Sequence, residues 1–199
     1  MREANAQAAG CVLAGGGSRR MGTDKALLEL NGKTLVSLAL DRFAGFPEIL
    51  VSAADAESYA FTGARIVPDE SPGMGPLGGL ISVLKAARSP LVCFRPVDAP
   101  LVPAALHTLL AAACAENAQD AAIPLFLGKP EPLLACFSKT SLPAFESLAL
   151  AGDFKVAKAF PMLNAVYIPL DSPELLSRLG EPSAYIVNAN DPDTFSKLL

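Results

Sequence analysis

The chain alternates short apolar segments with longer amphipathic ones, and this alternation limits its possible folds more than any other feature. The first half predicts strands at residues 11–14, 49–52, 65–67 and 91–94, and helices at residues 34–46, 54–61 and 80–87. Strands that alternate with helices are usually joined by crossover connections and therefore run parallel. We therefore predict an α/β fold with three layers, α/β/α, around a mostly parallel central sheet.

The second half of the chain is less regular, but it predicts the same class of fold. It predicts helices at residues 103–116, 142–150 and 192–199, and strands at residues 121–124, 133–137, 165–168 and 184–187. No repeat, low-complexity segment or linker interrupts the 199 residues, and this length suits one domain. We therefore expect residues 1–199 to form a single domain.

Composition and charge limit the class of protein and the binding partners that this chain can have. Hydrophobic residues make up 51% of the chain and charged residues 18%, which excludes a disordered tail or a coiled coil. Sixteen Lys and Arg against twenty Asp and Glu leave a net charge of −4. This balance argues against nucleic acid or an anionic membrane as a partner. Arg19, Arg20 and Lys25 nevertheless lie close together, so a local anion site is still compatible with the sequence.

The cysteines indicate a reducing compartment. Cys11, Cys93, Cys114 and Cys136 are widely spaced, form no CxxC pair and lie among apolar neighbours. We therefore expect buried free thiols. No apolar run approaches the roughly 20 residues that span a bilayer, and residues 1–7 are too polar for the core of a leader peptide. These features together predict a cytoplasmic protein.

A glycine-rich segment after the first predicted strand holds the densest group of candidate binding residues. Residues 13–25 read LAGGGSRRMGTDK. Three consecutive glycines, residues 15–17, let the backbone turn sharply and bring amide N–H groups close to a ligand. Such amides beside several cations suit a polyphosphate, whose charge must be neutralised during a reaction. The alternative is an ordinary strand-to-helix turn with solvated arginines.

Two familiar phosphate-binding patterns do not fit this chain. A dinucleotide fingerprint GxGxxG that starts at Gly15 would need a glycine at position 20, which is Arg20. A Walker A loop that ends at residues 32–34 would need its first glycine at position 27, which is Leu27. A hydride-transfer domain is therefore disfavoured.

Two carboxylates follow predicted strands of the sheet. Asp98 lies just beyond the strand at residues 91–94, at the edge where open α/β sheets bind ligands. One carboxylate, with substrate phosphates and water, is enough to hold Mg²⁺. Capping of the following turn is the alternative role for Asp98. Asp69 lies in a Pro/Gly-rich loop at residues 68–79, which either approaches a ligand or simply connects two elements.

Residues 13–35, LAGGGSRRMGTDKALLELNGKTL, closely resemble the signature of the nucleotidyltransferases that attach a nucleotide to molybdopterin. The nearest resemblance is to the molybdenum cofactor guanylyltransferases. The glycine-rich loop and the Arg-Met-Gly, Asp-Lys and Gly-Lys elements occur in the family's order. The resemblance implies a Rossmann-like nucleotidyltransferase fold, in which the N-terminal half binds the nucleotide and the C-terminal half binds molybdopterin.

The resemblance also implies a reaction and its residues. GMP would pass from GTP to the terminal phosphate of molybdenum-molybdopterin, pyrophosphate would leave, and Mg²⁺ would be the cofactor. Arg19, Lys25 and Asp98 would be catalytic, and Asp98 would bind the metal. The nucleotide would contact residues of the glycine-rich loop and of the two later loops: Leu13, Ala14, Gly15, Gly16, Gly17, Ser18, Lys25, Asp69, Gly78 and Asp98.

The acceptor side is less well marked in the sequence. Asn188 and Asn190 match an Asn-x-Asn pair near the family's pterin side, although a helix cap explains the segment equally well. Lys155 and Lys158 lie where the family contacts the pterin phosphate, or else on a solvated helix face. Apo-molybdoenzymes that receive the product are further implied partners.

Other functions are still compatible with these motifs. Guanylyl-transferring relatives resemble Leu-Ala-Gly-Gly, as at residues 13–16, whereas cytidylyl-transferring relatives usually have Leu-Ala-Ala-Gly. Sugar-phosphate nucleotidyltransferases share a related loop and fold. A nucleotide-binding regulator without turnover is the alternative of another class, and the presence of both Lys25 and Asp98 argues against it. The family's Asn after the second strand is missing, and Ser52 is the nearest hydrogen-bonding substitute.

Overall fold

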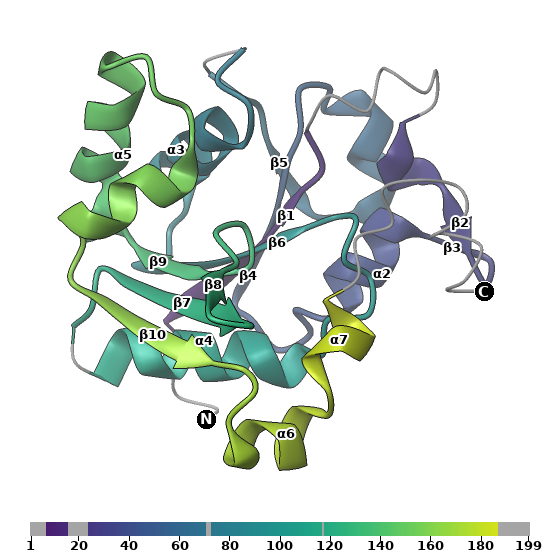
Figure 1. Ribbon diagram of the computed structural model, residues 1–199. Coiled ribbons are helices and arrows are strands. Elements are labelled where there is room, and N and C mark those ends of the chain that lie inside the picture. The colour runs from purple at the N-terminus through teal and green to yellow at the C-terminus, as the bar shows by residue number, and fades with distance from the viewer. Residues whose placement is uncertain (1–6, 16–23, 71–72, 117, 187–199) are drawn as a thin grey trace.

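The computed structural model describes residues 7–15, 24–70, 73–116 and 118–186, and these form a mixed sheet with helices on both faces (Figure 1). The eight strands of the sheet follow the order β10-β7-β9-β6-β1-β4-β5, and β8 pairs with β7. Their bounds are β1 Ala8–Leu13, β4 Glu48–Ser52, β5 Arg65–Val67, β6 Leu91–Pro96, β7 Ala121–Phe126, β8 Lys129–Pro130, β9 Cys136–Ser138 and β10 Ala165–Pro169.

The central strand β1 aligns the ends of its two neighbours. It runs parallel to β4 and to β6, and Leu13 pairs in register with both Ser52 and Pro96. The chain therefore leaves all three strands at the same edge of the sheet. In parallel α/β sheets, this edge is the one at which ligands bind.

The sheet separates the core into two layers of buried side chains, and helices cover each layer. Helices α2 (Leu35–Asp41) and α4 (Ala104–Glu116) pack on one face of the sheet, where they meet Ala8 and Val12 of β1. Helices α3 (Pro76–Ala86) and α5 (Leu142–Leu150) pack on the other face. The remaining elements are β2 Glu29–Leu30, β3 Lys33–Thr34, η2 Lys25–Leu27, η3 Glu57–Thr62, η4 Lys139–Ser141, η5 Val156–Met162, α6 Pro173–Leu179 and α7 Pro182–Tyr185.

The predicted α/β class is confirmed, with antiparallel pairs confined to one half of the sheet. Strand β9 runs antiparallel to both β6 and β7, and β8 runs antiparallel to β7. The four cysteines are buried free thiols, as expected. Among the described residues, no helix has both the length and the apolar character needed to cross a membrane.

Two predictions about individual elements are wrong. The strand predicted at residues 184–187 is not formed over its described part, residues 184–186, because residues 182–185 make the short helix α7, with Pro182 in its first turn. A short apolar run does not distinguish strand from helix, and proline favours a helix start. Helix α3 begins at Pro76, before the predicted start at residue 80, so Gly78 and Gly79 lie inside it. The helix predicted at residues 192–199 lies outside the described residues.

Candidate active site

The edge where β1, β4 and β6 end is held together by backbone hydrogen bonds. The amides of Ala14 and Gly15 both donate to the carbonyl of Ser52, with N···O distances of 2.9 and 3.0 Å. The amide of Val97 donates to the carbonyl of Leu13 at 3.2 Å. The start of the glycine-rich loop is therefore fixed to the end of β4, and the segment that leads to Asp98 is fixed to the neighbouring end of β1.

Lys25 and Asp98 meet at this edge, although they are 73 residues apart in the sequence. The Nζ atom of Lys25 lies 3.4 Å from Oδ2 of Asp98. Their side chains are 13% and 24% exposed, so the pair is partly buried but reachable from solvent. The sequence predicted a role for each residue, and the structure brings the two together.

The position of Lys25 depends on the residue before it. Lys25 begins the turn η2, and the Asp24 carboxylate caps this turn by accepting a hydrogen bond from the Ala26 amide at 3.0 Å. The hydroxyl of Tyr59 donates to the other oxygen of Asp24 at 2.6 Å. Sequence reasoning missed both residues. Asp24 matches a local turn-capping pattern, but nothing local marks its pairing with Tyr59.

Asp98 lies in a turn that is held by a buried arginine. Arg95 of β6 is fully buried, and its Nη2 donates to the carbonyl of Ala99. Burial and then the charge of Arg42 lower the pKa of Arg95 to about 9, so it stays protonated at neutral pH. Burial, followed by the charges of Arg95 and Arg42, holds the pKa of His107 well below its usual value. His107 is therefore a neutral core residue.

The second loop contains Asp69 and leads from β5 to α3, whose first turn holds Gly78, next to Gly79, which approaches Ser52 at the end of β4. The amide of Glu70 donates to Oγ of Ser82, which in turn donates to the carbonyl of Gly78 at 2.9 Å. These bonds tie the segment that contains Asp69 to the first turns of α3. Ser52, the expected substitute for the family's asparagine, is 3% exposed and packs close to Gly79.

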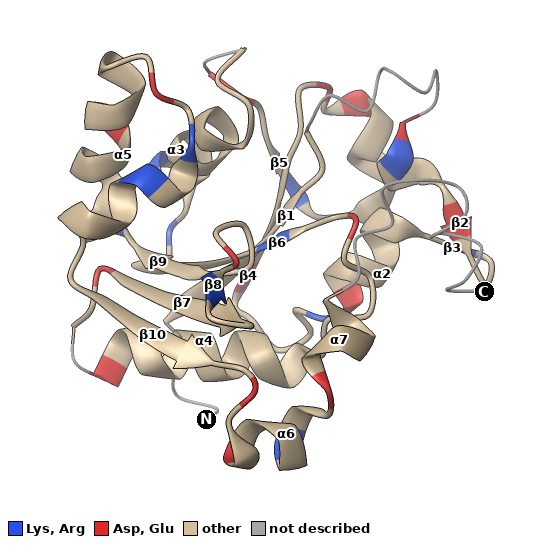
Figure 2. Cartoon of the chain, viewed as in Figure 1, with Lys and Arg blue, Asp and Glu red and all other residues tan. Residues whose placement is uncertain are grey.

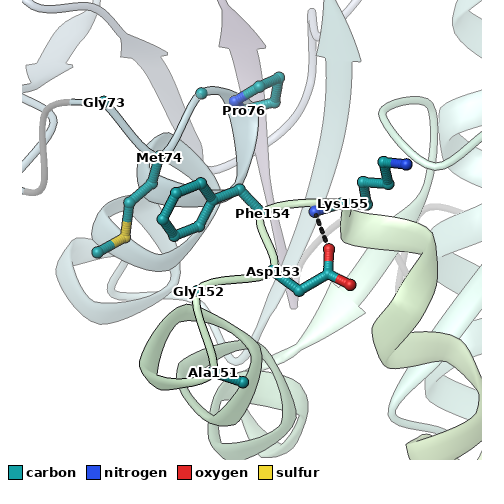
Figure 3. A pocket seen from close by; sticks show the side chains of 9 residues that line it. Gly73, Met74, Pro76, Ala151, Gly152, Asp153, Phe154 and Lys155 are labelled. Carbon is teal, nitrogen blue, oxygen red and sulfur yellow. Dashed lines mark hydrogen bonds between the residues drawn. The ribbon is translucent and has the colours of Figure 1, made fainter.

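A pocket of about 590 Å³ lies between the start of α3 and the segment that joins α5 to η5 (Figure 3). Met74 and Phe154 give it an apolar side, and Asp153 and Lys155 give it a charged one. The Asp153 carboxylate accepts a hydrogen bond from the Lys155 amide at 3.1 Å, which fixes this segment (Figure 3). The pocket thus has an apolar side and a charged side that carries both a carboxylate and a cation.

Comparison with known proteins agrees with this geometry. The family model described as the MobA-like NTP transferase domain matches residues 10–166, which contain the glycine-rich loop, Lys25, Asp98 and the pocket. The chain belongs to this family. 

Individual relatives of the MobA-like chain match it over nearly its whole length. A probable molybdenum cofactor guanylyltransferase of Carboxydothermus hydrogenoformans is 31% identical, covering 94% of this chain and 93% of the relative. A probable molybdenum cofactor guanylyltransferase of Chloroflexus aggregans is 35% identical, covering 92% of this chain and 89% of the relative. The crystal structure of molybdopterin-guanine dinucleotide biosynthesis protein A from Archaeoglobus fulgidus superposes with a TM-score of 0.81, at 26% identity and 96% coverage of both chains.

Several site residues predicted from the family resemblance lie outside the described part of the chain. They are Gly16, Gly17, Ser18 and Arg19 of the glycine-rich loop, and Asn188 and Asn190 near the C-terminus. Their roles stay predictions. Over the described part, Figure 2 shows acidic and basic residues interspersed along the fold.

Proposed function

We propose that this MobA-like protein transfers GMP from GTP to the terminal phosphate of molybdenum-molybdopterin, giving molybdopterin guanine dinucleotide cofactor and pyrophosphate. The observation that carries the proposal is the Lys25–Asp98 pair, which lies at the strand edge where the glycine-rich loop begins. The names of the similar proteins from Carboxydothermus hydrogenoformans, Chloroflexus aggregans and Archaeoglobus fulgidus support the same reaction.

The chemistry requires no protein nucleophile. A terminal phosphate oxygen of the acceptor forms a bond to the α-phosphorus of GTP while the bond from that phosphorus to the α–β bridging oxygen breaks. Pyrophosphate leaves with the bonding electron pair. Catalysis then consists of positioning and charge neutralisation, which suits a site with a lysine, a carboxylate and backbone amides. In this proposal Lys25, Arg19 and the amides of residues 16–18 hold the triphosphate, because the Gly15 amide already donates to the Ser52 carbonyl.

Asp98 is the residue that would hold Mg²⁺. The described residues contain no group of three His, Cys, Asp or Glu side chains that could cage a metal. A single partly exposed carboxylate fits Mg²⁺ only if substrate phosphates and water complete the coordination, which is its usual arrangement in phosphoryl-transfer sites. Bound Mg²⁺ would stabilise the negative charge that develops on the phosphate oxygens. Lys25, and Mg²⁺ held by Asp98, would thus both place positive charge beside the triphosphate.

The pocket beside α3 is our candidate for the acceptor side. Its volume of about 590 Å³ lies within the usual range for small-molecule sites. Phe154 and Met74 offer apolar surface for a ring system, and Lys155 offers a cation for its phosphate. Asn188 and Asn190 belong to this proposed pterin side by resemblance alone. Release of the product to apo-molybdoenzymes, and a cytoplasmic location, complete the proposal.

Gly15 supports guanine as the base. A β-carbon added to Gly15 would lie 3.7 Å from the nearest atoms, Cα of Ala53 and the carbonyl oxygen of Ser52. These are ordinary contacts, so packing does not require glycine here. Space for the ligand is then the remaining reason for glycine, and a larger purine is the base that benefits. Asp69 and Gly78 complete the proposed nucleotide contacts.

The proposal is tested by measuring pyrophosphate release with molybdopterin and either GTP or CTP as substrate. We expect GTP to be preferred and turnover to be lost in Asp98→Ala. Preferential use of CTP would favour the cytidylyl alternative. Nucleotide binding without any turnover by the unaltered protein would favour a regulator.

A further inference from the structure

We propose that Tyr59 is a positioning residue for the proposed reaction, because its hydroxyl holds Asp24 and thereby sets Lys25 opposite Asp98. The inference rests on the proposed function, in which Lys25 binds the triphosphate. Tyr59 acts through the carboxylate that precedes Lys25.

The two oxygens of Asp24 have separate partners. Oδ2 accepts from the Tyr59 hydroxyl at 2.6 Å, and Oδ1 accepts from the Ala26 amide at 3.0 Å. The carbonyl of Asp24 also accepts from the Leu27 amide at 3.0 Å. One oxygen thus anchors Asp24 to the body of the fold, and the other shapes the turn η2. Lys25 lies between these attachments, so its backbone position follows that of Asp24.

Tyr59 is a firm anchor because the turn that carries it is itself braced. Tyr59 is 2% exposed, and its carbonyl accepts from the Thr62 hydroxyl at 2.7 Å. Asp55 caps the start of η3 by accepting from the Glu57 amide at 2.9 Å and from the Ser58 hydroxyl. Gly63 closes the turn with a positive φ of 67°, which glycine adopts without strain. The phenol therefore has little freedom to move.

The chemistry of this contact favours a role beyond filling the core. A phenylalanine would bury the same ring, whereas the hydroxyl adds a hydrogen bond to a charged acceptor, which is stronger than one to a neutral acceptor. Burial and then the Asp24 carboxylate raise the pKa of Tyr59, so the phenol stays protonated and donates throughout the neutral range. The donor of this hydrogen bond therefore does not change its protonation state in the neutral range.

Tyr59→Phe tests the inference, because it removes the hydroxyl and keeps the ring. The matched control is Tyr185→Phe, since Tyr185 is also buried and its hydroxyl has no hydrogen-bond partner within the described residues. The measurement is the dissociation constant of GTP with Mg²⁺, without acceptor, at a temperature well below unfolding. We expect Tyr59→Phe to raise it roughly 3- to 10-fold and the control to leave it unchanged. A purely structural role would lower the melting temperature without changing this constant.

Two further substitutions, Asp24→Ala and Lys25→Ala, distinguish failure of this inference from failure of the proposed function. If Tyr59 acts through Asp24, adding Tyr59→Phe to Asp24→Ala should cause no further loss of GTP affinity. A full additional loss in the double variant, or an unchanged constant in Tyr59→Phe, would overturn the inference alone, provided that Lys25→Ala weakens binding. If Lys25→Ala binds GTP normally, the proposed function fails and the inference fails with it.

Discussion

Gly79 and Ser52 approach so closely that a β-carbon at position 79 would meet the Ser52 hydroxyl. A β-carbon on Gly79 would lie 2.5 Å from Oγ of Ser52 but 3.7 Å from its Cβ. Helix α3 therefore packs directly against the end of β4, where the Ser52 carbonyl also accepts the Ala14 and Gly15 amides. The second loop and the glycine-rich loop are thus positioned by the same residue.

Replacing Gly79 should destabilise the fold. We expect Gly79→Ala to lower the free energy of unfolding by about 1–3 kcal/mol, the usual cost of overpacking a tight contact. Because the clash involves Oγ alone, adding Ser52→Ala should recover much of this loss. Urea denaturation of the two single variants and the double variant measures the coupling. If the effects of the two single variants simply add in the double variant, contact with the Ser52 hydroxyl is not the cause of the loss in Gly79→Ala.

Gly15→Ala, unlike Gly79→Ala, should not destabilise the fold but should change the substrate preference. The added methyl group meets only ordinary contacts, and an alanine at a compatible backbone conformation restricts the unfolded chain. We therefore expect the free energy of unfolding to stay constant or rise by up to about 1 kcal/mol. The preference for GTP over CTP should fall, as measured by the ratio of their kcat/KM values. An unchanged preference for GTP would show that Gly15 does not determine which base the site accepts.

The Lys25–Asp98 pair should matter for catalysis far more than a comparable surface pair. We expect Lys25→Ala to lower kcat/KM for GTP by about 10²–10³, as for other losses of transition-state charge stabilisation. Lys33 forms an ion pair with Asp41 at 2.9 Å, but both side chains are more than half exposed. Lys33→Ala is therefore the matched control, and we expect it to change kcat/KM by less than about twofold. Equal effects in the two variants would contradict the special role of Lys25.

Glu131 predicts a pH dependence of stability. Burial raises the pKa of Glu131 above its ordinary value of 4.5. As the pH rises above that value, the folded protein keeps a proton that the unfolded chain has released, so the free energy of unfolding falls until the folded pKa is passed. Glu131→Gln should remove this part of the decline. Chemical denaturation of both proteins between pH 4 and 7 measures it, and parallel curves would show that Glu131 makes no contribution.

The sequence allowed prediction of the site where local pattern and sheet geometry were enough. Strand ends of a parallel sheet share one edge, so the glycine-rich loop and Asp98 could be expected near each other. The partners that hold them could not be expected in the same way. Tyr59 reaches Asp24 across 35 residues, and Arg95 looks like a surface cation until the sheet buries it. Both depend on tertiary packing, which no short window of sequence contains.

The errors at α3 and α7 have a similar origin. Glycines inside α3 look like loop residues, because the reason for Gly79 is the nearby Ser52 rather than a turn. Likewise, the apolar residues of α7 suit a strand, but Pro182 in the first turn favours a helix.

The shared register of β1 with β4 and β6 determines where residues can be added or removed in this protein without disrupting the sheet. Leu13 is level with Ser52 and Pro96, so adding or removing one residue within β1 would turn every side chain beyond that point to the opposite face and displace Gly15 from the Ser52 carbonyl. Residues added beyond these strand ends would leave the ladder intact. Altered substrate preference is therefore best sought by changing the loops, with strand lengths held constant.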